Sequence, residues 1–175
     1  MIAAMGGHLV PFPAPTGRRR AMICPMDATD RRMLAVLQRE GRITNAELAE
    51  RLHLSPSPCL RRLRALERDG VIAGYRAVLD RQRAGLELTV FVELKVDGHS
   101  DHTAAAISNA IHSTPEIVSA HIVSGSADFL LEVVVADLPA YERLMFDTLL
   151  KLPNVADVRS NFALRTVKEP GPLPL

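Results

Sequence analysis

The sequence predicts an α+β fold: an N-terminal winged helix-turn-helix followed by a C-terminal ferredoxin-like βαββαβ domain. Three observations support this prediction. Apolar residues recur with the helical period of about 3.6 residues up to residue 72, and from Leu86 they alternate with the period of a strand. Residues 44–70 form two short amphipathic stretches that are joined by a turn. The charge also changes sign between the two parts of the chain.

Charge is distributed unevenly, although the net charge of the 175 residues is only +1. Residues 1–25 carry +3, residues 26–83 carry +4 and residues 84–168 carry −5. A basic part beside an acidic part is typical of a module that binds a polyanion joined to a module with another task. No apolar run reaches the roughly 18 residues of a membrane span, so we expect no contact with a membrane.

The first 25 residues are rich in proline and glycine, and we expect them to be a disordered leader. They are either a dispensable extension or a basic arm that touches DNA. Cys24 and Cys59 lie in unrelated contexts without metal-ligand spacing. His99 and His102 have no third ligand beside them. We therefore expect no metal, no cofactor and a reducing, cytoplasmic location.

Helices begin at residue 26, where the predicted helix-turn-helix domain (26–72) starts. Asp27 is a good N-cap for the first helix, and Thr44 with Glu47 forms a capping box for the second. His53 follows at the turn, which favours a left-handed backbone conformation that histidine tolerates at some cost. A third helix is predicted to start near Ser57, with Pro58 in its first turn.

The third helix carries the candidate DNA-binding residues. A projection at about 100° per residue places Ser57, Arg61 and Arg68 opposite the apolar residues of this helix. Outward residues near the start of such a helix reach base edges, and flanking arginines neutralise phosphates. The flanking positions are Arg62 and Arg64. The full predicted set of DNA-contacting residues is Ser55, Ser57, Arg61, Arg62, Arg64, Arg68 and Arg42.

Beyond residue 72 the pattern changes twice. Residues 73–85 are predicted to be a short hairpin or a linker. Residues 86–168 then give the βαββαβ domain, and residues 169–175 give a disordered tail. The predicted strands of the βαββαβ domain span 86–97, 117–123, 128–136 and 155–167. Its predicted helices span 100–113 and the stretch that Asp137 caps. The uncovered sheet face carries Phe91, which predicts pairing with a second sheet.

Several motifs resemble the Lrp/AsnC (feast/famine) family of bacterial transcription regulators. They are DxxDxxxLxxLQxxGR (27–42), LSPSPCLRRLRxLExxGVIxGY (54–75), VSG (123–125), DFLL (128–131) and LLKLPNV (149–155). The resemblance covers residues 26–168. It implies a regulator of transcription that binds double-stranded DNA, forms homodimers through sheet packing, and assembles further into tetramers or octamers on the nucleoid.

The resemblance also implies a small effector, commonly an amino acid, bound where dimers meet. The site implied for it contains Gly125, Ser126, Asp128 and Thr148. The family loop reads G-D-x-D, and here Ser126 replaces its first acidic residue, so a hydroxyl stands where a carboxylate pairs with an α-ammonium group.

Two alternatives to an effector-dependent regulator remain open at the level of sequence. One is an architectural protein that wraps DNA without responding to any effector. The other is a small-molecule-binding or enzymatic α/β module, for which Glu93, His121 and Glu132 are the candidate acid–base residues. The sequence contains no G-x-S-x-G motif, P-loop or glycine-rich dinucleotide turn, so we expect no catalysis.

Overall fold

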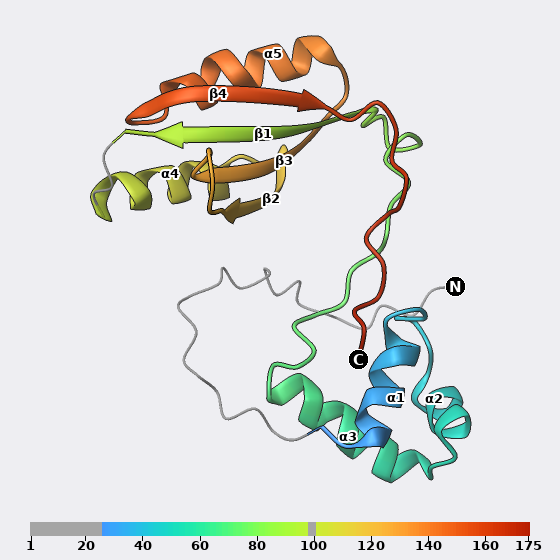
Figure 1. Ribbon diagram of the computed structural model, residues 1–175. Coiled ribbons are helices and arrows are strands. Elements are labelled where there is room, and N and C mark those ends of the chain that lie inside the picture. The colour runs from blue at the N-terminus through green and yellow to red at the C-terminus, as the bar shows by residue number, and fades with distance from the viewer. Residues whose placement is uncertain (1–25, 98–100) are drawn as a thin grey trace. The chain divides into compact units, whose positions relative to one another are not determined.

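The computed structural model describes residues 26–97 and 101–175, with the side chains of 101–103 left undescribed. The predictions for the leader 1–25, for His99 and for the pairing of His102 lie outside these described parts. The described chain forms two compact units (Figure 1). The helix-turn-helix unit comprises residues 26–77 together with 170–175, and the sheet unit comprises residues 78–169.

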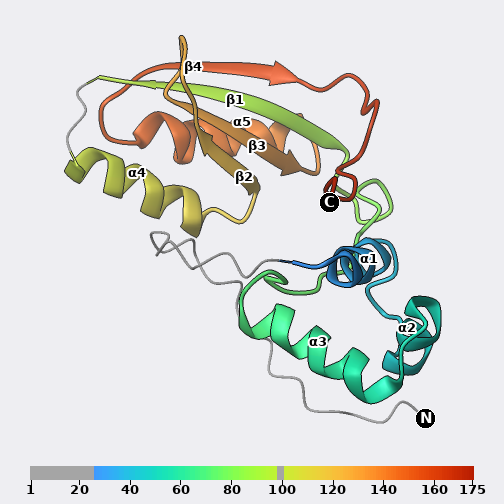
Figure 2. The same ribbon diagram turned by 60° about the horizontal axis from the view of Figure 1, so that its bottom comes forward.

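Three helices build the helix-turn-helix unit: α1 (Ala28–Leu37), α2 (Asn45–Leu52) and α3 (Pro56–Arg68) (Figure 2). Each helix contributes apolar side chains to one core, because its apolar residues recur on one face. The buried members of this core are Met33, Leu34, Leu48, Ala49, Leu52, Cys59 and Leu66. The small Ala49 of α2 belongs to this core, and α2 and α3 pack against one another.

Both predicted N-terminal caps are confirmed. The Asp27 carboxylate accepts hydrogen bonds from the backbone N–H groups of Thr29 and Asp30, each at 2.8 Å. Thr44 and Glu47 form the reciprocal capping box of α2. These bonds satisfy backbone donors that the first turn of a helix otherwise leaves unpaired.

The turn between α2 and α3 has the predicted left-handed residue. His53 adopts φ 56° and ψ 44° directly after α2, and its N–H group bonds the last turn of that helix. The predicted start of α3 is one residue late. Ser55 is its N-cap and Pro56 occupies the first helical position, where the missing N–H costs nothing.

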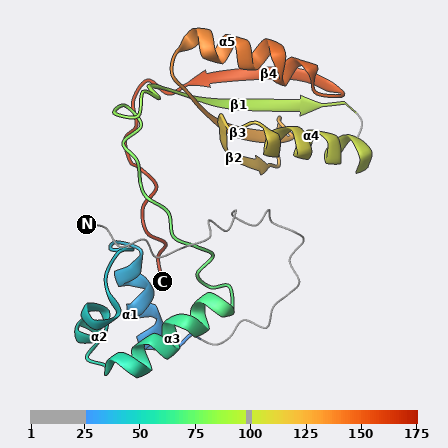
Figure 3. The same ribbon diagram turned by 180° about the vertical axis from the view of Figure 1, so that it is seen from behind.

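The sheet unit has the predicted βαββαβ order. Its elements are β1 (Leu88–Val96), α4 (Asp101–Ser113), β2 (Ile117–Ile122), β3 (Phe129–Val135), α5 (Leu138–Asp147), a 3₁₀ turn η1 (Leu149–Lys151) and β4 (Val155–Phe162). The strands form one antiparallel sheet in the order β2-β3-β1-β4 (Figure 3).

One face of this sheet carries the core of the unit. Val90, Val92 and Leu94 alternate along β1 and are fully buried, and both helices pack against the cluster that they form with β3. Tyr141 of α5 is the largest buried side chain of this core. Its ring packs edge-on against the ring of Phe162, with 5.5 Å between the ring centroids. Phe91 points to the opposite face and is 41% exposed, as the alternation predicts.

Two predicted elements are shorter or absent. Residues 73–80 form neither helix nor strand, so the short hairpin is not formed within this chain. The last strand ends at Phe162 and not at residue 167, and Leu164 is 99% exposed. No neighbouring strand pairs with residues 164–167 in the described chain, and a strand persists only where its backbone groups find partners.

The C-terminal residues 170–175 form neither helix nor strand and are exposed, yet they contact the helix-turn-helix unit. Residues 170–175 belong to the helix-turn-helix unit. The Gln38 side-chain amide donates to the carbonyl oxygen of Leu173 at 3.3 Å, and the Leu173 N–H donates to the amide oxygen of Gln38. The predicted disorder of residues 169–175 stays a prediction, and composition does not reveal this contact because its partner lies 135 residues earlier in the chain.

Candidate nucleic-acid interface and ligand sites

The outer side of α3 carries most of the predicted DNA-contacting residues. Ser57, Arg61, Arg64 and Arg68 are all exposed, as the helical projection predicts. Arg68 forms an ion pair with Asp69 at 3.0 Å, whereas Arg61 and Arg64 form none within the described residues. Guanidinium groups without a protein partner are free to bind phosphates or to form bidentate bonds with a guanine edge.

Arg62 differs from the other arginines of α3. Its guanidinium donates to Asp27 at 2.7 Å and to Asp30 at 2.8 Å, both at the start of α1. The backbone N–H of Asp30 and the Arg62 guanidinium lower the pKa of Asp27, and the two carboxylates raise the pKa of Arg62. This ion pair joins α3 to α1, and the phosphate contact of Arg62 stays a prediction.

Residues at the N-terminal end of α3 lie close to the start of α2. The Asn45 side chain donates to the carbonyl oxygen of Pro56 at 3.0 Å and so connects the two helices. The Ser55 hydroxyl caps no backbone N–H and is exposed, as is Arg42. Asn45 was absent from the predicted site because its bond joins residues that only the turn brings together.

The loop between β2 and β3 contains three of the residues implied as effector-binding. Gly125 adopts φ 132°, a conformation that favours glycine. The Asp128 carboxylate accepts a hydrogen bond from the Val96 N–H at 2.8 Å. Lys95 donates to the carbonyl oxygen of Ser126 at 3.3 Å. Asp128 thus has a structural task, since it fastens the start of β3 to the end of β1.

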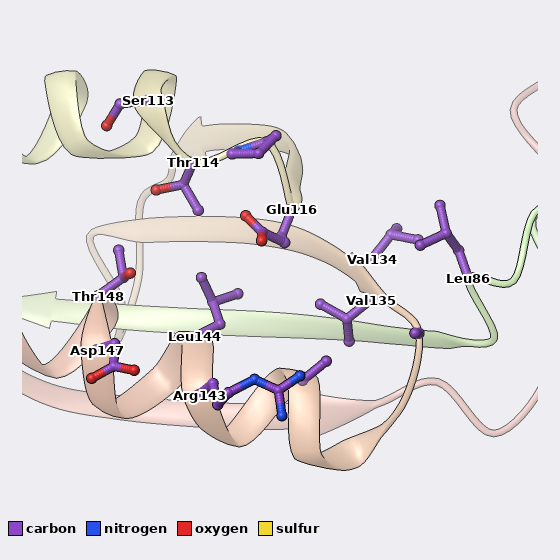
Figure 4. A pocket seen from close by; sticks show the side chains of 13 residues that line it. Leu86, Ser113, Thr114, Glu116, Val134, Val135, Arg143, Leu144, Asp147 and Thr148 are labelled. Atoms are coloured by element: carbon purple, nitrogen blue, oxygen red, sulfur yellow. The ribbon is translucent and has the colours of Figure 1, made fainter.

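Thr148 lies elsewhere in the sheet unit. It lines a cavity of about 470 Å³ between the end of α4 and α5, and this cavity contains none of Gly125, Ser126 and Asp128 (Figure 4). One subunit therefore does not bring the four implied residues together. The side chains labelled in this cavity are Leu86, Ser113, Thr114, Glu116, Val134, Val135, Arg143, Leu144, Asp147 and Thr148.

The candidate acid–base residues are engaged in bonds that stabilise the sheet unit. Glu132 forms an ion pair with Arg81 at 2.9 Å, and Glu93 accepts from Asn161 at 3.3 Å. The His121 ring shares a hydrogen bond with Ser119 at 3.0 Å. Each of the three residues is thus bonded to a different partner, and no bond among the three is found in the described residues.

The described residues contain neither a candidate metal-ligand cluster nor a candidate membrane-spanning helix. No group of three or more His, Cys, Asp or Glu side chains there has the proximity of a metal site. Within residues 26–97 and 101–175, no helix combines the length and apolar character that crossing a bilayer requires. Burial raises the pKa of the Cys59 thiol, which packs in the core.

Each of the two units matches a known family of protein domains. A winged helix-turn-helix DNA-binding model matches residues 26–73, and a model of the Lrp/AsnC ligand binding domain matches residues 89–173. The leucine-responsive regulatory protein of Escherichia coli (strain K12) is 42% identical over 144 residues, which cover 82% of this chain and 88% of that protein.

Two solved structures of transcriptional regulators are similar to this chain over most of its length. A transcriptional regulator of Neisseria meningitidis, in complex with L-Met, is similar with a TM-score of 0.81 and 38% identity, over 85% of this chain and 96% of that one. An AsnC family transcriptional regulator from Agrobacterium tumefaciens has a TM-score of 0.81 and 36% identity, over 85% of this chain and 97% of that one.

Proposed function

The chain belongs to the Lrp/AsnC family of DNA-binding transcriptional regulators, and from this premise we propose that a small amino-acid effector sets its assembly on DNA. The family is not enzymatic, and its C-terminal domain is a ligand-binding domain. Relatives named for leucine response or solved with L-Met support an effector with an α-ammonium and an α-carboxylate group. An effector shifts assembly only if it binds one arrangement better than another.

The DNA-contacting surface in this proposal is the exposed side of α3. The observation that carries it is Arg61, an exposed arginine of the first half of α3 without an ion pair among the described residues. Ser57 precedes it by one turn, and Arg64 and Arg68 supply phosphate contacts. Ser55 and Arg42 extend the contact on the N-terminal side. Arg62 is a positioning residue, because both of its carboxylate partners belong to α1.

Dimers in this proposal form through the sheet face that the helices leave uncovered. A dimer then presents two copies of α3 to a two-fold DNA site, and contacts between dimers give larger assemblies on the nucleoid in the cytoplasm. The effector binds where dimers meet. Thr148 and the loop of Gly125, Ser126 and Asp128 can then contribute to one site from different subunits.

An architectural protein that ignores effectors is the second candidate. It is favoured by the loop itself: Ser126 offers only a hydroxyl, and one oxygen of Asp128 is already bonded to the Val96 N–H. A thermal-shift screen with the twenty amino acids separates the two functions. A ligand that both raises Tm and changes a DNA gel shift supports the sensor. If no amino acid does so, the architectural function stands.

Replacing Asp128 by asparagine tests the effector site. The amide oxygen of asparagine still accepts the Val96 N–H, whereas the negative charge is lost. If the Asp128 carboxylate pairs with the effector's ammonium group, effector affinity falls roughly 10- to 150-fold, since charged hydrogen bonds contribute about 1.5–3 kcal/mol. Isothermal titration with the amino acid from the screen measures this. Asp97→Asn, an exposed carboxylate beside Val96, is the matched control. Equal affinity of both variants would remove Asp128 from the site.

Replacing Phe91 by lysine tests the dimer. A buried charge in the middle of a sheet-to-sheet contact is expected to raise the dimer dissociation constant about 30-fold or more, equivalent to the roughly 2 kcal/mol of a strong interface residue. Sedimentation across a concentration series gives this constant. Phe146→Lys, an aromatic residue of α5 that is 60% exposed, serves as the control and is expected to keep the dimer. A dimer of normal stability in the Phe91 variant would exclude this face as the interface.

A further inference from the structure

The C-terminal segment 170–175 binds the helix-turn-helix unit by its backbone. The side-chain amide of Gln38 presents a donor and an acceptor side by side, as a peptide group does. It uses both on one residue: Nε2 donates to the Leu173 carbonyl oxygen at 3.3 Å, and Oε1 accepts the Leu173 N–H. The Leu173 backbone is thus held much as it would be by a neighbouring strand.

An apolar groove lies beside this segment, whose Leu173 and Leu175 side chains line it while staying 71% and 51% exposed. It encloses about 350 Å³, and one wall is made by α1 and the residues that follow α3. Leu173 and Leu175 contribute to the lining from the C-terminal segment. The other apolar side chains that line the groove are Met26, Leu34, Leu37, Val71, Ile72 and Tyr75. Val71 and Tyr75 keep 40% and 51% of their surface exposed beside the segment, so the segment covers the groove only in part.

The composition of the segment suits an extended ligand. Pro170, Pro172 and Pro174 fix φ near the polyproline value and leave few conformations to lose on binding. Proline also lacks an N–H group, so Leu173 offers one of the few backbone donors of the segment, and that donor is the one that Gln38 accepts. Alternation of proline and leucine therefore presents one bonded backbone position and two apolar side chains.

We propose that residues 170–175 are a docking peptide that binds the α1 groove of its own chain and ties the helix-turn-helix unit to the sheet unit a second time. The chain leaves the helix-turn-helix unit between Ala77 and Val78 and returns to it between Glu169 and Pro170. Two connections restrict the motion of a DNA-binding unit more than a single linker does, because both ends must move together. The part of this proposal that concerns regulation rests on the proposed function.

Hydrogen–deuterium exchange on the full chain tests the docking itself. A chain that ends at Glu169 and the variant Gln38→Ala are both expected to exchange at least about tenfold faster in residues 34–38 and 71–75, the two stretches that contain most of the groove's lining residues. Leu164→Ala is the matched control, since Leu164 is 99% exposed, and it is expected to leave exchange unchanged. Adding the synthetic peptide EPGPLPL to the shortened chain is expected to restore protection. Unchanged exchange in both variants overturns the proposal.

Cross-linking distinguishes the chain's own segment from that of a second copy. In a chain with Cys24→Ser and Cys59→Ala, the substitutions Arg39→Cys and Pro174→Cys place thiols next to the contact between Gln38 and Leu173 and leave that contact intact. A short bismaleimide then joins the two thiols. Intact-mass spectrometry that finds one chain plus one linker, with both thiols consumed, supports binding within one chain, and a product of double mass or the absence of a bridged product overturns it. Neither this experiment nor the exchange experiment requires DNA or an effector, so both stand if the proposed function fails.

A gel-shift titration tests the consequence for regulation. Deleting residues 170–175 is expected to leave the effector's dissociation constant unchanged while reducing the effector-induced change in DNA affinity at least about threefold, since coupling needs a restricted pair of units. An unchanged effector response in the shortened chain, together with faster exchange of the groove, overturns the regulatory part of the proposal. Loss of both effector binding and response counts against the proposed function.

Discussion

Replacing Arg61 by alanine is expected to weaken specific DNA binding by about 1–3 kcal/mol, or roughly 5- to 150-fold in the dissociation constant. The reason is that an exposed guanidinium on the first half of α3 has the reach and the donor geometry to read a base edge. A gel-shift titration at fixed salt, against the specific site and a scrambled site, measures the effect. The loss is expected mainly on the specific site.

Two arginine variants serve as controls for Arg61. Arg165→Ala removes an equal charge from an exposed position of the sheet unit and is expected to change affinity for both sites little. Arg62→Ala breaks the ion pairs with Asp27 and Asp30, so it is expected to lower the stability of the helix-turn-helix unit as well as DNA affinity. If Arg61→Ala binds both sites as the unmodified protein does, Arg61 reads no base.

Replacing Leu48 by alanine is expected to destabilise the helix-turn-helix unit by about 2–5 kcal/mol, because it opens a cavity in a small core. Leu48 is 1% exposed and lies where α1, α2 and α3 meet. The sheet unit has a core of its own and is expected to stay folded. Denaturation followed by circular dichroism, with exchange measured for each unit, should show one unit melting early and DNA binding lost.

The specificity of this effect is checked in the other core and on the surface. Leu149→Ala, fully buried in the sheet unit, is expected to destabilise that unit and to leave exchange in α1–α3 unchanged. Leu79→Ala, at a position that is 71% exposed, is expected to change neither unit. A single cooperative loss of both units in Leu48→Ala would contradict the independence of the two cores.

Much of the candidate DNA interface was predictable because its determinants are local. Asp27 and Thr44 are N-caps, which bond backbone groups only two or three residues ahead, and both predicted caps are confirmed. The exposed side of α3 follows from helical periodicity alone, even though the predicted start was one residue late. The ligand site could be predicted less well from the sequence. The family motif implies Thr148 together with the loop of Gly125, Ser126 and Asp128, and within one subunit Thr148 lines a cavity that contains none of the loop residues.

The sequence by itself determined the order of elements, the caps, the left-handed turn at His53 and the alternation that buries one face of the sheet. Each of these depends on side chains within a few positions of one another. The tertiary structure alone decided that Arg62 pairs with α1, that Asp128 bonds the Val96 N–H and that Leu173 binds Gln38. These contacts join residues 32 to 135 positions apart, and no local propensity specifies which distant partner a charged or amide group will meet.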